Sequence, residues 1–188
     1  VAILRNINYV ENGRYGHSVD ISGDVIVVGS GTISPAYAMV FVKPQDGWRD
    51  TTQSANLEPS DGKSGKSFGW ALSIFGDVIV VGARGVNSNA GSAYVFQKPE
   101  TGWETMNETA KLTASDSESG DFFGSSISNT DDVIAIGAYN DDDIYSKSGA
   151  VYLYSKPESG WSNMTETVKI KASDASANDF FGVSVSVS

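Results

Sequence analysis

The chain has 188 residues, a formal net charge of −10 and no cysteine. The acidic balance excludes a basic surface of the kind that neutralises nucleic-acid phosphates, and the lack of cysteine excludes disulfides, thiolate metal sites and a cysteine nucleophile. No apolar run approaches the length of a membrane span, so we expect no membrane insertion. The first residue is Val1, and we expect the chain to be processed or excerpted from a longer one.

The chain opens with a short apolar segment, residues 1–5, which predicts the outer strand of a preceding unit and leads into a polar loop through Gly13. Val19 then alternates with Ser18 and Asp20, the period of a strand with one buried face. Gly23 marks a tight turn, because a hairpin needs a residue with positive φ. The continuous apolar run 25–28 predicts a strand buried on both faces.

This stretch recurs three times, the last time cut off by the end of the chain. The glycine that opens it recurs at intervals of 53, 55 and 58 residues, as Gly16, Gly69, Gly124 and Gly182. The equivalents of Val19 are Leu72, Ile127 and Val185. Asp131 replaces the turn glycine in the third copy, and Asp tolerates a positive φ better than most residues. No helix is evident.

Each apolar run is followed by a variable loop and an aromatic strand, at 39–42, 93–96 and 151–154. A Lys-Pro pair ends each aromatic strand, because proline cannot donate to a β-ladder. A Gly-Trp turn follows, and we expect its tryptophan to pack between neighbouring sheets rather than stack on a ligand. A short strand closes each unit, at 55–57, 110–112 and 168–170.

Four strands per unit at this period indicate an all-β fold made of β-propeller blades, each a four-stranded antiparallel sheet. We expect three complete blades with flanking strands. Residues 1–13 form the outer strand of a preceding blade and a connecting loop. Blade 1 then covers 14–66, blade 2 covers 67–121, blade 3 covers 122–179, and residues 180–188 form the first strand of a following blade.

The order Phe-Gly, Ser-Val/Ile-Ser, Gly-Asp and an apolar run ending in Val-Gly-Ala resembles the FG-GAP repeat of integrin α-subunit propellers. Bacterial and algal FG-GAP proteins are more similar still, through the Lys-Leu-Thr-Ala-Ser-Asp segment at 111–116 and its counterpart at 169–174. The resemblance covers essentially the whole chain. It implies an extracellular or cell-surface propeller used for adhesion or for recognition of protein or glycan.

Calcium does not carry over from integrins, because the turns at Gly23, Gly76 and Asp131 are too short to wrap a cation with six to eight oxygen ligands. The densest acidic cluster lies elsewhere, in the loop after the third apolar run, and comprises Asp141, Asp142 and Asp143. These carboxylates, flanked by Ser146 and Ser148, are the candidate calcium ligands. The alternative is a solvated acidic loop.

Other aspartates recur at fixed places in the repeat, and for these we favour hydrogen bonds to backbone N–H groups in Asx turns over metal binding. They are Asp61, Asp116 and Asp174, which follow a serine, and Asp121 and Asp179, which precede the Phe-Phe-Gly motif.

The catalytic inventory is poor. His17 stands beside Ser18 and Asp20, but neighbours along a strand point to opposite faces, so no triad is expected and no catalytic residue is assigned. We expect a non-catalytic recognition or scaffold module that binds protein or glycan through its blade loops. One alternative is a self-assembling unit, a homo-oligomer or polymer, that shares edge strands such as 1–5 and 183–187. Another is an accessory domain of an enzyme.

Overall fold

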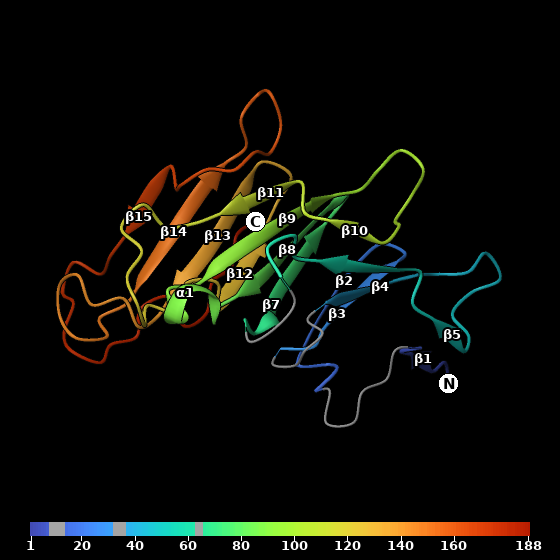
Figure 1. The fold of residues 1–188 in the computed structure, drawn as a ribbon, viewed down its shortest axis with the longest axis horizontal. Coiled ribbons are helices and arrows are strands. Elements are labelled where there is room, and N and C mark those ends of the chain that lie inside the picture. Colours follow the sequence, from blue (N-terminus) through green and yellow to red (C-terminus); the bar gives the residue numbers. More distant parts are fainter. Residues whose placement is uncertain (8–13, 32–36, 63–65) are drawn as a thin grey trace.

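The computed structural model describes residues 1–7, 14–31, 37–62 and 66–188. It is nearly all-β and contains, besides the two-stranded pair of β1 and β5, three sheets of four or five strands. Figure 1 shows these larger sheets following one another from the blue strands through the green to the orange. The predicted connecting loop through Gly13 lies outside the described residues from residue 8 onward. None of the helical structure in the described ranges has the length and apolar character needed to cross a membrane.

Each blade consists of four antiparallel strands that pair in chain order, which confirms the predicted fold class. Blade 1 contains β2 (Ser18–Ser22), β3 (Val25–Gly29), β4 (Ala38–Val42) and β6 (Ala55–Glu58). Blade 2 contains β7 (Phe68–Phe75), β8 (Val78–Ala83), β9 (Ser92–Gln97) and β11 (Ala110–Leu112). Blade 3 contains β12 (Ser126–Asn129), β13 (Val133–Ala138), β14 (Ala150–Ser155) and β15 (Val168–Ile170).

Short parallel pairings join the outer strand of one blade to a segment of the next. The outer strand β6 pairs with β10 (Met106–Asn107), and Leu112 of β11 forms a bridge with Met164. In the same way β1 (Leu4–Arg5) pairs with β5 (Thr51–Thr52). The strand β1 therefore lies, relative to blade 1, where β6 lies relative to blade 2.

Each sheet has a leading face, toward the following blade, and a trailing face, toward the preceding one. Between blades 1 and 2 the leading face supplies Val27, Ala38, Val40, Ala55 and Leu57, and the trailing face supplies larger side chains that include Phe68, Tyr94, Phe96 and Trp103. Between blades 2 and 3 the corresponding groups are Val78, Val80, Val95 and Leu112 against Phe123, Tyr152, Tyr154 and Trp161. Small aliphatic side chains thus pack against aromatic ones at each junction.

The tryptophans of the Gly-Trp turns pack as expected between the sheets. Trp103 and Trp161 are buried in the two junction cores, and Trp48 packs against the buried residues Tyr37, Met39 and Phe41 of blade 1. Their role in this fold is to close the trailing face of each sheet.

The burial predicted for blade 1 is partly wrong. Val19 and Ile21 are 60% and 56% exposed, whereas the equivalent Leu72 and Ile74 in blade 2 are 8% and 5% exposed. Likewise β8 is buried throughout, but β3 is only half-buried at Ile26 and Val28. These side chains differ in exposure because blade 1 covers the trailing face of blade 2, whereas no four-stranded sheet among the described residues covers the trailing face of blade 1.

Three further local expectations need correction. Asp131 does not adopt a positive φ, because the Thr130 hydroxyl accepts a hydrogen bond from Val133 N–H and closes the turn another way. Residues 183–188 form no strand, since within the described chain no fourth sheet offers them an antiparallel partner. A short helical segment, α1 (Val86–Asn89), does occur. Asn87, Ser88 and Asn89 all have positive φ, so it is a left-handed turn rather than an α-helix.

The closest approach between blades is backbone against backbone. The glycine at the end of each second strand faces the carbonyl oxygen of the Phe-Gly glycine of the next unit, in the pairs Gly29 with Gly69, Gly82 with Gly124 and Gly137 with Gly182. A Cβ atom on any of these three second-strand glycines would collide with that carbonyl group. They have no positive φ, so glycine is required here for space alone.

This contact predicts an unusually costly substitution. Gly82→Ala should lower the free energy of unfolding by about 3 kcal/mol, because neither backbone can move without separating the two sheets. The control is Gly23→Ala, where φ is +56° but no atom lies within 4 Å of the added Cβ, and the expected cost is about 1 kcal/mol. Urea denaturation measures both; equal losses would refute the packing argument.

Candidate functional site

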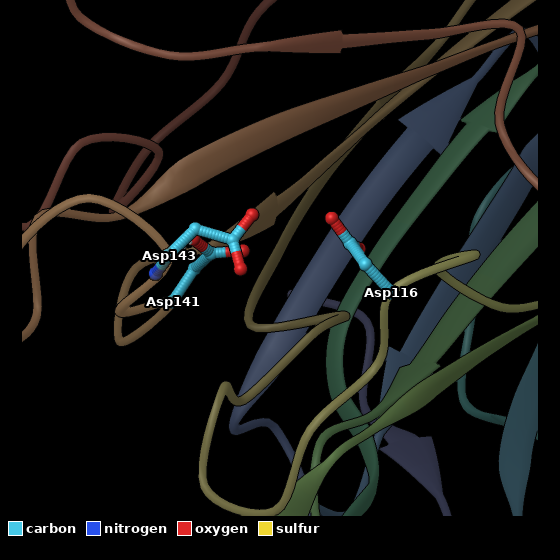
Figure 2. Close-up of side chains that lie close together, drawn as sticks. All are labelled: Asp116, Asp141 and Asp143. Atoms are coloured by element: carbon cyan, nitrogen blue, oxygen red, sulfur yellow. Dashed lines mark hydrogen bonds between the residues drawn. The ribbon is translucent and has the colours of Figure 1, made fainter.

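The predicted calcium ligands are divided by the structure. Asp141 and Asp143 lie on the loop after β13 with their carboxylates turned toward Asp116, which follows β11 of blade 2 (Figure 2). One carboxylate oxygen from each of these three residues lies within 4.8 Å of the others. Asp142 does not belong to this group, and its side chain is exposed.

A lysine ammonium already lies between the three carboxylates. Lys169 Nζ, from β15, donates to Asp116 Oδ2 at 2.6 Å, to Asp141 Oδ2 at 2.7 Å and to Asp143 Oδ2 at 2.5 Å. The Tyr152 hydroxyl of β14 donates to Asp116 at 2.9 Å and to Asp141 at 2.7 Å. A divalent cation would have to displace this ammonium group, and the calcium assignment stays a prediction.

The electrostatics of the cluster follow from these contacts. Hydrogen bonds from Lys169 and Lys171 lower the pKa of Asp143 to about 2. Burial would lower the pKa of Lys169, but its bonds to the three carboxylates outweigh burial and raise that pKa above the usual value. Burial, reinforced by the bond to Asp141, raises the pKa of the Tyr152 hydroxyl. All three side chains thus keep the protonation state that the ion pairs need at neutral pH.

The same arrangement occurs one blade earlier, between blades 1 and 2. Asp61 accepts hydrogen bonds from Tyr94 Oη at 3.0 Å and from Lys111 Nζ at 2.5 Å, and it pairs with Lys66 at 2.9 Å. We call each set an Asp–Tyr–Lys latch: Asp61, Tyr94 and Lys111 at the first junction, and Asp116, Tyr152 and Lys169 at the second. Burial would raise the pKa of Asp61, but the bonds from Lys111, Lys66 and Tyr94 prevail and lower it to about 2.

The structure divides the aspartates that recur in the repeat into two groups. Asp61 and Asp116 bind side chains of the next blade, because each stands just beyond an outer strand and faces that blade, and no backbone N–H in the described ranges donates to either carboxylate. Asp121 and Asp179 do accept hydrogen bonds from backbone N–H groups, but from three residues earlier rather than in Asx turns: Asp121 from Glu118 N–H at 2.7 Å and Asp179 from Ser176 N–H at 2.5 Å.

A second group of side chains lies at the same end of the blades, beside the first strands. It forms a continuous row across all three blades, here called the aromatic row: His17, Trp70, Arg84, Phe122, Tyr139 and Phe180. Arg84 Cζ lies 3.1 Å from the centroid of the Trp70 ring and 5.1 Å from that of Phe122.

The row continues beyond Arg84. Phe122 stacks on Tyr139 at 5.6 Å between ring centroids, and Arg84 donates to the Tyr139 hydroxyl at 3.3 Å. Apart from the exposed His17, these side chains are half-buried, so part of each faces solvent. Stacked rings with an inserted guanidinium hold one another in place.

The three residues weighed as a triad are separated by their contacts. The His17 ring lies 4.2 Å from the ring of Trp70, Ser18 Oγ donates to Gly69 O at 2.8 Å, and Asp20 accepts from Ile74 N–H at 2.8 Å. Each therefore contacts a different point of blade 2, and the arrangement serves the junction between the blades.

Sequence reasoning missed the lysines and tyrosines of the latches and most of the aromatic row. A signal was present, because Lys111 and Lys169 recur with the same 58-residue spacing as Tyr94 and Tyr152. The doubled phenylalanine before Gly124 and Gly182 was also visible, but nothing in the sequence places Arg84 between Trp70 and Phe122.

A family model described as FG-GAP repeat matches residues 51–96, 106–154 and 164–188, which together are more than half of the chain. The three matched segments begin 55 and 58 residues apart, the intervals of the repeat itself. No curated protein matches the chain.

The latch between blades 2 and 3 predicts the effect of removing its ammonium group. Lys169→Met leaves the buried Asp141 carboxylate without a cation and should lower the free energy of unfolding by about 3–5 kcal/mol. The control is Lys171→Met. Lys171 is more exposed and, among the described residues, pairs with Asp143 alone, so its removal should cost about 1 kcal/mol or less. Thermal melts with about 1 mM Ca²⁺ or with chelator complete the test. Calcium should stabilise Lys169→Met more than the wild type, and equal responses would count against Lys169 as the competitor for that site.

Asp121 predicts a pH dependence of the opposite sign to Asp143. Burial raises the pKa of Asp121 to about 6, despite the hydrogen bond from Glu118 N–H, so the folded state holds a proton that the unfolded state has lost. Stability from this group is present below about pH 4 and is lost as the pH rises to about 6. Asp121→Asn keeps an acceptor for Glu118 N–H and removes the buried charge. It should be more stable than the wild type at pH 8 by on the order of 2 kcal/mol, with no gain near pH 4. A gain that is the same at both pH values would contradict this account.

Proposed function

The chain belongs to the FG-GAP repeat family, and on that premise we propose that it is a non-catalytic recognition module of the propeller type. Its ligand is a protein or glycan, bound through loops at one end of the blades on an extracellular protein or at a cell surface. The observation that carries the proposal is the aromatic row, which crosses three blades and is partly open to solvent.

The chemistry of the row suits recognition. Trp, Tyr and Arg dominate the few residues that carry most of the binding energy in protein interfaces, and aromatic rings offer a large contact area at low entropic cost. Here Trp70 comes from the start of β7 and Arg84 and Tyr139 from two loops, and the three are fixed by stacking and one hydrogen bond. Preorganisation of this kind lowers the entropy lost on binding.

The position of the row supports the same proposal. Trp70 is near the start of β7, Arg84 follows β8, and Tyr139 follows β13, so the rigid strands determine where the loop side chains lie. Binding residues are often found on loops held by a rigid scaffold of this kind. The loops of the Asp–Tyr–Lys latches lie at this end too, but their carboxylates are already paired with lysines.

Trp70→Ala and Arg84→Ala should each weaken binding at this site by about tenfold or more, the loss expected when a central interface residue is truncated. The probes are a printed glycan array and a panel of immobilised extracellular glycoproteins. The matched control is Phe75→Ala, an aromatic residue of the same strand β7 that is 45% exposed at the opposite end. Near-UV circular dichroism checks that the variants remain folded.

Either of two results would refute the proposal. One is that the wild type binds no member of either panel. The other is that Phe75→Ala and Trp70→Ala reduce binding equally.

A further inference from the structure

Arg84 has no acidic partner within the described ranges, although the chain as a whole is acidic. The net charge is −10, and most of the described lysines and arginines form ion pairs with aspartates, as Lys66 does with Asp61 at 2.9 Å. Arg84 forms no such pair there, and its guanidinium donates one hydrogen bond, from Nη1 to the Tyr139 hydroxyl. A guanidinium carries several N–H donors in one plane, so most of those of Arg84 stay available to a ligand.

Burial makes the lack of a counter-ion costly. Arg84 is half-buried, and burial lowers the pKa of its guanidinium although the Tyr139 hydroxyl opposes that change. A charge removed from water needs an opposite charge to compensate for the lost hydration. Asp121 precedes Phe122 of the row, but its carboxylate accepts from Glu118 N–H, and no ion pair joins it to Arg84 in the described structure. A bound anion would supply the compensating charge.

A second guanidinium group lies near the same part of the row. His17 contacts Trp70 at 4.2 Å between ring centroids, and its pKa is lowered by burial and then by the charges of Arg84 and Arg14. Both guanidinium groups are therefore close to one imidazole ring. Arg14 is exposed and pairs with no carboxylate among the described residues. Two uncompensated positive charges on a protein of net charge −10 create a local positive potential that attracts an anion.

The ring faces of the row are largely taken up by contacts within the row. Arg84 Cζ lies 3.1 Å from the centroid of Trp70, so the guanidinium covers one face of that ring. Phe122 and Tyr139 stack with 19° between their ring planes and cover one another. A sugar needs an open ring face to stack on, whereas ring edges carry the positive end of the aromatic quadrupole. The arrangement therefore favours an anionic protein side chain over a stacked sugar.

The fold brings two repeated positions to the row, and the residues at these positions set its charge. One is the residue before each Phe-Gly or Tyr-Gly pair, which has a positive φ in every unit: 41° at Arg14, 51° at Ser67, 57° at Phe122 and 54° at Phe180. The other is the position after the second strand, which is Arg84 in blade 2 and Tyr139 in blade 3. The row is thus cationic around blades 1 and 2 and uncharged and aromatic in blade 3.

We propose that the aromatic row binds an acidic peptide segment of a partner protein, with a glutamate or aspartate carboxylate bound to Arg84. This inference rests on the proposed recognition function and specifies its ligand. The planar guanidinium fits both oxygens of a carboxylate at once. Arg14 adds positive charge, and the ring edges of Trp70 and Phe122 add their positive potential. An apolar side chain next to the acid on the peptide packs against Phe122 and Tyr139.

The test presents the 188-residue chain to an array of synthetic peptides. Each peptide has a central glutamate flanked by a different pair of residues, and each has a counterpart with glutamine in place of the glutamate. Fluorescence anisotropy then measures the affinity of the peptides that bind. The wild type should bind the glutamate peptide about tenfold more tightly than its glutamine counterpart, the difference expected from a hydrogen bond to a charged group.

The decisive quantity is the affinity ratio between the two counterparts. Arg84→Gln should abolish the preference for glutamate, and Arg84→Lys should retain part of it, because lysine keeps the charge but not the planar pair of donors. The matched control is Arg49→Gln, the same substitution at an exposed arginine beyond the opposite end of β4, which should leave the ratio unchanged. Trp70→Ala should weaken binding of both counterparts. A structural loss alone would not change the ratio, and near-UV circular dichroism checks the fold of each variant.

Three results would overturn this inference while the recognition function stands. The first is that peptides bind but the two counterparts bind equally well. The second is that Arg84→Gln and Arg49→Gln reduce the preference to the same extent. The third is that, on the glycan array, sugars with a carboxylate bind through Arg84 while no peptide does, which would make the ligand a glycan. Binding to no peptide, glycan or glycoprotein would refute the recognition function together with this inference.

Discussion

The spacing and register of the blades depend on the glycine at the end of each second strand. Gly29, Gly82 and Gly137 admit the Phe-Gly carbonyl group of the next unit where any side chain would stand. The phenylalanine before that carbonyl then enters the core edge-on to the aromatic strand, as Phe123 does with Tyr152 at 5.3 Å. Because a carbonyl and a ring are adjacent in the chain, one close backbone approach also fixes where the core side chain lies. The two recurring features of the repeat motif, the second-strand glycine and the Phe-Gly pair, are thus two halves of one contact between successive blades.

The asymmetry of each sheet gives the array its direction. Leading faces present small aliphatic residues such as Ala55 and Leu57, while trailing faces present rings such as Tyr94 and Phe96. Two aromatic faces would hold the sheets too far apart for the glycine contact, and two aliphatic faces would leave voids. The latches follow from this geometry, because the tyrosine side chain on the trailing face is long enough for its hydroxyl to reach the aspartate beyond the outer strand of the preceding blade. Replacing both partners of a buried ion pair by apolar residues is often neutral, whereas removing one partner leaves a buried charge unpaired, so we infer that the intact latches contribute mainly to register.

Much of the fold was predictable from the sequence, because strand alternation, Gly turns and Lys-Pro breaks are local signals that recur in every unit. The errors arose where the packing of the adjacent blade determines whether a side chain is buried or which partner it contacts. Val19 has the same local pattern as Leu72, yet it is exposed because its blade has no covering sheet in the described structure. Asp141 and Asp142 are adjacent in sequence, but only Asp141 turns toward Lys169, which is supplied 28 residues later by another strand. A repeat period identifies equivalent positions; it does not reveal which side chains of the next blade they contact.

The two latches also explain why carboxylates gather at the second junction. At the first junction, within the described ranges, the Asp61 carboxylate faces the ammonium groups of Lys66 and Lys111. At the second junction the loop after β13 adds Asp141 and Asp143, so three carboxylates face Lys169 and Lys171. The additional carboxylates therefore extend the same Asp–Lys contact that joins the blades at the first junction. Carboxylates held by lysines at the outer edge are poorly placed to bind a partner. The half-exposed rings and guanidinium beside the first strands have no such constraint, and for that reason the aromatic row is the stronger candidate for recognition.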